Sequence, residues 1–274
     1  MVDKIKSLGT LAFPILKYTS QKGVEKVEDV VAVETPLLIK LKLPDGSIED
    51  LVITMQTPGH TEDLVRGFLY NEGIIDNLDN IESMQSAEAE MTVQLHQAPL
   101  HLASRNTVST AACGMCGKTS LDAIKLVRDF GLKQYQYKVS PAMLLKFDRL
   151  LREKQVLFES TGGIHAAALF DKNGNLLCLR EDVGRHNAVD KAIGSMLHNK
   201  LSAHEMILFV SGRAGFELVQ KSLVSGITMM IAVGAPSSLA VDYATKYGLT
   251  LIGFMQNSRF NVYSHPQRLN FEKN

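Results

Sequence analysis

The stretch MILFVSGRAGFELVQKSLVSGITMMIAVGAPSSLAVDYATKYGLTLIGF, residues 206–254, decides the fold. Three short apolar runs alternate in it with two segments whose apolar residues have helical spacing. The expected strands are 206–210, 229–233 and 249–254, and the expected helices are 216–224 and 237–246. Strands that alternate with helices of about ten residues are typical of a layered α/β sheet with helices on its faces.

The residues before this stretch extend the pattern. Two apolar runs, 164–170 and 176–181, flank a polar turn at 172–175 and predict a hairpin. Residues 187–197 have helical spacing and predict a further helix. We therefore expect one α/β domain over residues 141–274.

The first half of the chain is typical of an α+β domain. The expected elements are a long strand at 30–43, a returning strand at 48–55, a helix from Thr61 to about Gly73 and a strand at 91–96. Pro141 interrupts the chain near the middle, which places the domain boundary between about residues 136 and 145. The smaller first domain is then expected to span residues 1–140.

Composition excludes several classes of partner. Lys plus Arg and Asp plus Glu are both 29, so a bulk electrostatic preference for nucleic acid or an anionic membrane has no support. No apolar run reaches the roughly 18 residues that cross a bilayer. Gly9 and Pro14 interrupt the apolar N-terminal patch, which is expected to be an ordinary, mobile segment. Three cysteines are too few for a secreted disulfide scaffold, so we expect a reducing, cytoplasmic location.

Two of these cysteines form the motif Cys113-Gly114-Met115-Cys116. The surrounding residues, 104–118, are rich in Ser, Thr, Ala and Gly and predict a mobile loop. Lys118 and a helix expected at 121–130 would lower the pKa of a nearby thiol, which favours the reactive thiolate. A thiolate there could attack a sulfane sulfur and carry it as a persulfide.

Other interpretations of the motif were weighed. A zinc site needs further ligands, and no second C-x-x-C or paired His is present, while Cys178 lies within an alternating strand. The zinc-deaminase pattern lacks its H-x-E, and a P-loop lacks its first glycine because Ala112 stands there. A thioredoxin-like dithiol and a pair of structural cysteines stay open, although sulfur or redox chemistry is favoured.

Each of three expected strands is followed by a glycine-containing loop, at 211–215, 234–238 and 253–259. If the strands are parallel, these loops meet at one edge of the sheet, where open α/β sheets bind ligands. Arg213 and Arg259 and the following helix N-termini would favour a phosphate group. Ordinary loop and capping chemistry explains any one loop equally well.

Two further stretches, 160–165 and 181–187, place polar residues beside glycines before a regular element. They add His165 and His186 to the candidate residues, although a lone histidine is more often a packing or surface residue.

The motifs CGMCG, STGGIHAAALF, REDVGRHNAVDKAIG, SGRAGFELVQKS and APSSLAVDYA occur in the order found in the FdhD/NarQ family of formate dehydrogenase accessory sulfurtransferases. The upstream VAVETPLLIKL and TPGHTEDLVRGFLYNEGII also resemble that family, so the resemblance spans about residues 30–268. Gly215 departs from it, because the family commonly has Ser there, and the effect on the ligand pocket is open.

The resemblance implies a sulfur carrier. Such proteins take sulfur from a cysteine desulfurase as a cysteine persulfide. They deliver it to the molybdenum or tungsten bis-guanine-dinucleotide cofactor of formate dehydrogenase, Mo-bis(molybdopterin guanine dinucleotide) in the molybdenum form. It also implies a homodimer, no intrinsic metal, and a C-terminal three-layer αβα domain similar to cytidine deaminases. The motifs do not say which metal or which formate dehydrogenase is served.

The same resemblance assigns the residues. Cys113 matches the persulfide cysteine and Cys116 the second thiol. The family's cofactor-binding segment matches Phe254, Met255, Gln256, Asn257, Ser258 and Arg259, and the loops described above add Gly212, Arg213, Thr161, Gly162, His165, Arg185 and His186. A cofactor-binding chaperone without sulfur chemistry and a dithiol oxidoreductase stay as alternatives.

Overall fold

The computed structural model describes residues 5–7, 9–100, 108–109, 130–135 and 137–271. The motif at Cys113–Cys116, and with it nearly all of the expected mobile loop, lies outside these residues. The expected helix at 121–130 lies outside them as well, apart from its last residue.

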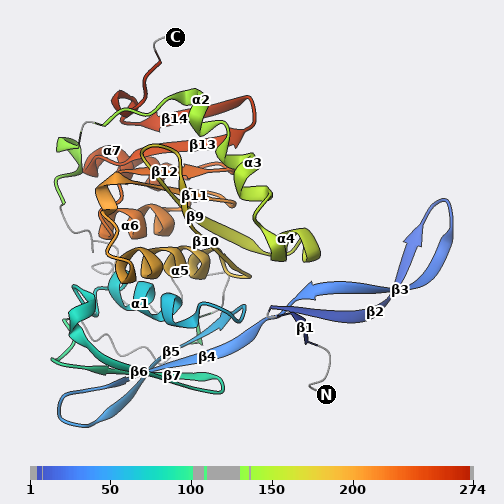
Figure 1. Ribbon diagram of the computed structural model, residues 1–274, viewed down its shortest axis with the longest axis horizontal. Helices are drawn as coiled ribbons and strands as arrows, with labels where there is room; N and C mark the ends of the chain where they lie inside the picture. Colours follow the sequence, from blue (N-terminus) through green and yellow to red (C-terminus); the bar gives the residue numbers. More distant parts are fainter. Residues whose placement is uncertain (1–4, 8, 101–107, 110–129, 136, 272–274) are drawn as a thin grey trace.

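A six-stranded sheet organises the second half, in the order β10-β9-β11-β12-β13-β14 (Figure 1). Its strands are β9 (His165–Asp171), β10 (Leu176–Asp182), β11 (Met206–Val210), β12 (Met229–Ala232), β13 (Thr250–Gln256) and β14 (Arg259–Ser264). β11, β12 and β13 run parallel, and the other neighbours pair antiparallel. The five strands expected in this half are confirmed, and β14 is an addition that returns from β13 as a hairpin.

Helices cover both faces of this sheet. One face packs against α5 (Arg185–His198), α6 (Phe216–Val224) and α7 (Ser238–Tyr247), all three of which were expected. The other face packs against residues of α2 (Pro141–Leu144) and α3 (Phe147–Arg152), and α4 (Val156–Thr161) follows them. The expected arrangement of a sheet with helices on its faces is therefore confirmed.

A second, five-stranded sheet, in the order β6-β7-β4-β5-β8, belongs to the first half. Its strands are β4 (Thr35–Lys42), β5 (Ile48–Gln56), β6 (Ile81–Ala87), β7 (Glu90–Leu95) and β8 (Val108–Ser109). α1 (Thr61–Asn71) lies between this sheet and α5 (Figure 1). Glu62 and Asp63 stand in its first turn, where acidic groups favour the helix dipole.

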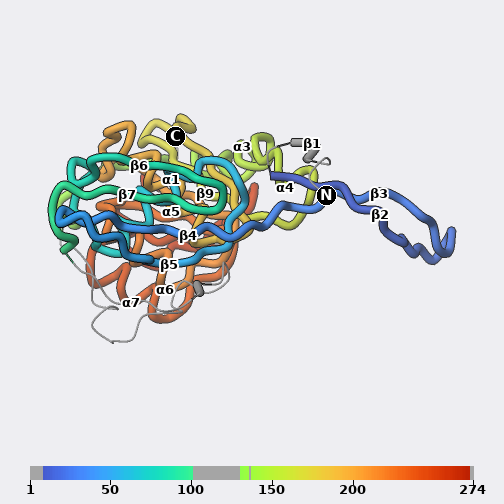
Figure 2. Tube along the Cα trace, turned by 90° about the horizontal axis from the view of Figure 1, so that it is seen from below, coloured from blue at the N-terminus to red at the C-terminus, as the bar shows by residue number. Residues whose placement is uncertain are grey.

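The N-terminal residues form an arm that extends away from the body (Figures 1 and 2). β2 (Thr10–Thr19) and β3 (Gly23–Ala32) pair in one long hairpin, with β1 (Ile5–Ser7) beside its base. The single strand expected at 30–43 is therefore wrong, because the chain leaves one sheet and enters another between Ala32 and Thr35. The mobility expected of this segment stays a prediction.

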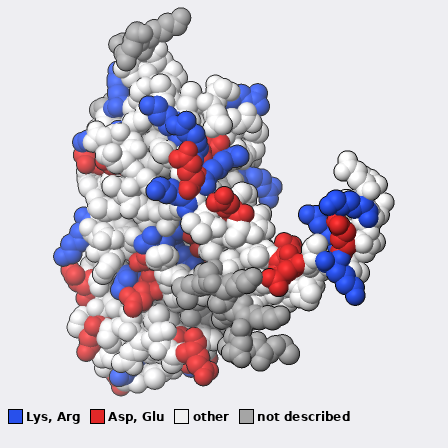
Figure 3. Space-filling model, turned by 45° about the vertical axis from the view of Figure 1, so that its right-hand side comes forward, with Lys and Arg blue, Asp and Glu red and all other residues white. Residues whose placement is uncertain are grey.

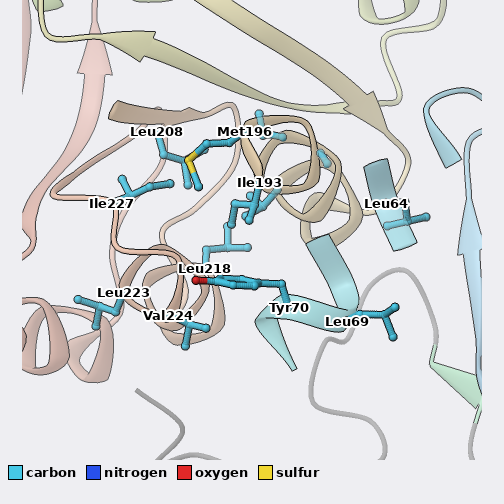
Figure 4. Close-up of a cluster of buried hydrophobic side chains, with 14 of the residues drawn as sticks. Leu64, Leu69, Tyr70, Ile193, Met196, Leu208, Leu218, Leu223, Val224 and Ile227 are labelled. Atoms are coloured by element: carbon cyan, nitrogen blue, oxygen red, sulfur yellow. The ribbon is translucent and has the colours of Figure 1, made fainter. Parts of the chain in front are cut away.

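The two sheets are joined through a close contact between α1 and α5. A Cβ atom added at Gly67 would lie 1.9 Å from the carbonyl oxygen of Asp190, and one added at Gly194 would lie 1.9 Å from that of Asp63. Only glycine permits this approach of two helix backbones. Around it, one apolar core takes residues from both halves of the chain, and Figure 4 shows Tyr70 of α1 beside Leu218 of α6.

Buried charges reinforce the same contact, and each has a partner. Arg180 Nη2 lies 2.8 Å from Asp63 Oδ2, and Lys221 Nζ lies 2.7 Å from Asp190 Oδ1. Lys191 Nζ lies 2.7 Å from Asp182 Oδ2, and both side chains are almost fully enclosed. Burial lowers the pKa of Lys191, and the negative charge of Asp182 acts in the opposite direction.

The surface carries charges of both signs, as the equal numbers of basic and acidic residues predict. Lys and Arg are interspersed with Asp and Glu on the face drawn in Figure 3. Within the described ranges, no helix combines the length and the apolar character that a membrane span requires.

Candidate functional site

The loops that follow β11, β12 and β13 meet at one edge of the six-stranded sheet, as expected. The amide of Gly234 donates to the carbonyl of Gly212 at 3.0 Å, and the amide of Phe254 donates to that of Gly234 at 3.1 Å. The amide of Ser211 donates to Ala166 on β9 at 3.0 Å. We call the region formed by residues 211–215, 234–238 and 253–254, with His165 and Arg185, the strand-end edge.

Gly212 brings two candidate side chains together at this edge. A Cβ at Gly212 would lie 3.5 Å from His165 Nδ1 and 4.0 Å from Arg185 Cδ, so His165 and Arg185 both border the glycine. Arg185 is also the first residue of α5, whose N-terminus carries partial positive charge. Partial burial, followed by the charge of Arg185, lowers the pKa of His165. The imidazole of His165 is therefore neutral near pH 7, and it lies beside Arg185 and the N-terminus of α5, both of which favour an anion.

His186 lies deeper and is held by α6. Its Nε2 pairs with the carboxylate of Glu217, while Nδ1 is buried and has no hydrogen-bond partner. A buried polar atom without a partner is uncommon in folded proteins. The ring is therefore oriented by one nitrogen, and the other stays available for a ligand.

The segment 254–259 forms the tip of the β13–β14 hairpin, where the pairing is irregular. Phe254 has φ of +53°, in the left-handed region that non-glycine residues rarely occupy, and its side chain is 42% exposed. Met255 is fully buried in the core, so its side chain faces away from the surface. Gln256 accepts a hydrogen bond from Arg259 Nε at 2.8 Å, and Asn257 and Ser258 are exposed in the turn.

The remaining predicted residues lie on either side of the edge. Arg213 is exposed and its Cγ would lie 2.9 Å from a Cβ at Gly234, so its side chain runs over the neighbouring loop. Thr161 and Gly162 end α4, where Thr161 Oγ1 donates to the carbonyl of Leu157 at 2.7 Å.

A cavity of about 490 Å³ lies between residues of the strand-end edge and residues of α3 and α4. Gly162, His165 and Ser211 line it from the sheet side. Asp148, Arg152 and Gln155 line it from α3 and the turn before α4, and the sequence analysis missed all three. Short helices leave too few turns for a periodic pattern, so no signal in the sequence separates these residues from other polar positions. The volume falls within the roughly 300–1,000 Å³ of small-molecule sites.

Comparison with known proteins identifies the family. The family model described as the FdhD/NarQ family matches residues 32–270, which is most of the chain. The chain belongs to the FdhD/NarQ family. A family member from Nocardia farcinica, named sulfur carrier protein FdhD, is 43% identical over 258 residues, covering 90% of each chain. One of the same name from Picrophilus torridus is 41% identical over 245 residues, covering 89% of this chain and 93% of its own.

The fold has also been observed in a crystal structure. A chain from Desulfotalea psychrophila, described as a formate dehydrogenase accessory protein, superposes with a TM-score of 0.76. It is 24% identical, and the match covers 96% of this chain and 100% of that one. The family fold therefore includes both sheets described above.

Proposed function

We propose that this protein is a cytoplasmic sulfurtransferase that serves formate dehydrogenase. Cys113 accepts sulfur from a cysteine desulfurase as a persulfide and transfers it to the bis-guanine-dinucleotide cofactor of molybdenum or tungsten. Membership of the FdhD/NarQ family and the name of its relatives, sulfur carrier protein, support the proposal.

The observation that carries the proposal is the meeting of Gly212, His165 and Arg185 at the strand-end edge. Glycine permits close approach, and Arg185 at the N-terminus of α5 favours the phosphates of a dinucleotide. We assign Arg213 to the same phosphates and the exposed ring of Phe254 to an apolar part of the cofactor.

In the carrier, Cys113 holds the persulfide, and Cys116 assists its release or stores sulfur. The Cys113 thiolate attacks the outer sulfur of the desulfurase persulfide, a new S–S bond forms, and the desulfurase thiolate leaves. For release, the Cys116 thiolate attacks the inner sulfur of the Cys113 persulfide. A Cys113–Cys116 disulfide forms, hydrosulfide leaves for the metal, and a thiol reductant restores the pair.

We further propose that the protein is a homodimer. We also propose that residues 141–274 form a ligand-binding domain related to cytidine deaminases, which the helices on both faces of the sheet support.

Mass spectrometry tests the assignment of the sulfur. The protein is incubated with a cysteine desulfurase, cysteine and a thiol trap, and the Cys113 peptide is expected to gain one sulfur atom. Cys113→Ala should lose both this adduct and the activation of formate dehydrogenase. Cys178→Ala is the matched control, because Cys178 is buried and burial raises the pKa of its thiol.

The alternatives predict other results. A cofactor-binding chaperone would keep full activation in Cys113→Ala. A dithiol oxidoreductase would also form a reversible Cys113–Cys116 disulfide, and it would differ from the carrier by carrying no sulfur adduct.

A further inference from the structure

The β2–β3 arm exposes apolar side chains although it extends away from the body (Figures 1 and 2). Leu16 is 68% exposed, Tyr18 74% and Val24 64%. A hairpin of two strands is only marginally stable in water by itself, so an arm of this length needs a surface that covers it. The family model begins at residue 32, where the arm ends, so the arm lies outside the part of the chain that this model matches.

The register of the hairpin sorts its side chains onto two faces. Residues that pair across the two strands share a face, and successive pairs alternate between the faces. One face, which we call the arm face, consists of the pairs Ala12–Val30, Pro14–Glu28, Leu16–Lys26 and Tyr18–Val24. Its β2 side is apolar except for the phenol hydroxyl of Tyr18. Its β3 side carries one basic and one acidic side chain between two valines.

The order of these residues makes the arm face complementary to itself. When two copies stack face to face about a two-fold axis with their arms antiparallel, β2 lies over β2 and β3 over β3. An axis midway between the pairs Pro14–Glu28 and Leu16–Lys26 sets Leu16 over Pro14 of the second copy, and Lys26 over its Glu28. The symmetry repeats each contact, so apolar side chains meet apolar ones and basic side chains meet acidic ones.

The opposite face of the arm does not have this property. It carries Asp29 and Glu25 on β3, on either side of the pair Ile15–Val27. The same arrangement centred on that pair would set Asp29 over Glu25 of the second copy, and like charges in contact are unfavourable. Charge therefore selects the arm face for contact with a second copy.

A hollow in the middle of the arm supports this choice. It has a volume of about 490 Å³ and lies at the level through which the two-fold axis would pass. Its lining consists of Pro14, Ile15, Leu16, Lys26, Val27 and Glu28. Four of these six residues belong to the arm face, so the hollow offers a seat for the Leu16 side chain of a second copy.

We propose that the arm face pairs with the arm face of a second copy of this chain. At the base of the arm Ala12 is already buried and α4 packs beside the two strands. Tyr18 of the second copy therefore ends next to α4, where the side chain of Val156 is 71% exposed. The inference names a surface for the homodimer proposed above and does not depend on sulfur chemistry.

The size of the arm face sets the strength of the pairing. Strands of ten residues, at about 3.4 Å per residue and about 4.8 Å apart, give a face of roughly 34 by 10 Å. A face of this size is at the low end of specific interfaces. The pairing is therefore reversible and depends on the protein concentration.

Sedimentation velocity of the full chain over a concentration series measures the pairing. Lys26→Glu sets two acidic side chains against each other at both contacts and should raise the dimer Kd about tenfold or more. Glu28→Lys sets two basic ones against each other and should have a similar effect. Lys17→Glu makes the same change of charge on the opposite face, so as the matched control it should leave the Kd close to that of the wild type.

Mixing the two variants separates a lost contact from a damaged arm. In an equimolar mixture of Lys26→Glu and Glu28→Lys, opposite charges meet again at both contacts, so the mixture should dimerise with a Kd close to that of the wild type. Damage to the arm in either variant could not be repaired by mixing. A mixture that associates no better than its components would overturn the proposal.

Failure of this inference differs from failure of the proposed function. If Lys26→Glu dimerises as tightly as the wild type, the arm face is not the interface and the proposed homodimer stands. A monomeric wild type overturns both the arm interface and the homodimer. Sulfur carriage is decided separately, by the adduct on Cys113.

Discussion

The α1–α5 contact and the strand-end edge are both rich in glycines and charged side chains, but they use them differently. In the contact, Gly67 and Gly194 allow the backbones of α1 and α5 to approach each other closely. At the edge, a Cβ at Gly212 would come no closer than 3.5 Å to His165, and one at Gly234 would meet the Arg213 side chain at 2.9 Å, so no helix backbone approaches these glycines as closely.

The polar groups differ in the same way. Lys191 is paired with Asp182 inside the contact. At the edge and its cavity, His186 Nδ1 and Gln155 Nε2 are buried without partners. Burial alone therefore does not mark a ligand site in this chain. Nor does an unsatisfied polar atom mark one on its own, because Asn71 Oδ1 in the contact is also buried without a partner.

The largest effect should come from breaking a pair in the contact. Lys191→Met leaves the Asp182 carboxylate enclosed, with hydrogen bonds only from Thr57, Gly184 and Asn187. Removing one partner of a buried ion pair should lower the free energy of unfolding by about 4 kcal/mol, measured in urea. Lys246→Met, on the surface, should change it by less than about 0.5 kcal/mol. A loss of the same small size in Lys191→Met would contradict a structural role for the pair.

The next effect concerns the glycines. Gly194→Ala places a methyl group 1.9 Å from the carbonyl oxygen of Asp63, so the helices must separate. We expect a loss of about 3 kcal/mol in the free energy of unfolding. Gly163→Ala is the counterpart near the edge, where the nearest atom is 3.8 Å away, and should be close to neutral. Equal losses in the two variants would erase the distinction between the regions.

A substitution at the edge should affect binding more than folding. Phe254→Gly removes the ring assigned to the ligand but relieves a left-handed backbone. The affinity for GDP should fall about tenfold in a titration, while the free energy of unfolding changes by less than about 1 kcal/mol, because backbone relief offsets lost packing. A large loss of stability with unchanged affinity would show that Phe254 belongs to the core.

The smallest effect is a dependence on pH. The pKa of His165 lies below its ordinary value of 6.5 because of burial and the charges of Arg185 and His186, while Asp182 acts weakly the other way. As the pH falls, His165 is protonated in the unfolded chain before it is protonated in the folded one. The free energy of unfolding therefore falls as the pH drops below 6.5 towards the lowered pKa. Comparison of unfolding midpoints at pH 7.5 and 5.5 should show a smaller drop in His165→Gln. His60→Gln should remove a separate contribution, because burial also lowers the pKa of His60, and should leave the contribution of His165 in place.

Much of the fold follows from periodicity in the sequence. The strands and helices of residues 206–254 were predicted because each is long enough, and buried enough, to show its period. α2, α3 and α4 were missed because four to six residues give little more than one helical turn. The arm was missed because its side chains are exposed on both faces, so no alternation marks its strands.

The site was predicted in part. Glycines after parallel strands indicated where the loops would meet, and the hydrogen bonds from Gly234 to Gly212 and from Phe254 to Gly234 confirm that meeting. Asp148 and Gln155 could not be found, because they approach each other only through the turn between two short helices. The roles of Cys113 and Cys116 and the domain boundary near residue 140 stay predictions.

Pro14 in the arm has a consequence for solubility. The outer edges of β2 and β3 are unpaired along most of the hairpin. Leu16 and Tyr18 on β2 are largely exposed. Unprotected edge strands promote aggregation, because their unpaired N–H and C=O groups can pair with a strand of another chain. Pro14 has no N–H to donate, so it interrupts the ladder that another strand would need along β2. The arm can therefore stay extended in a concentrated solution without seeding fibres along that strand.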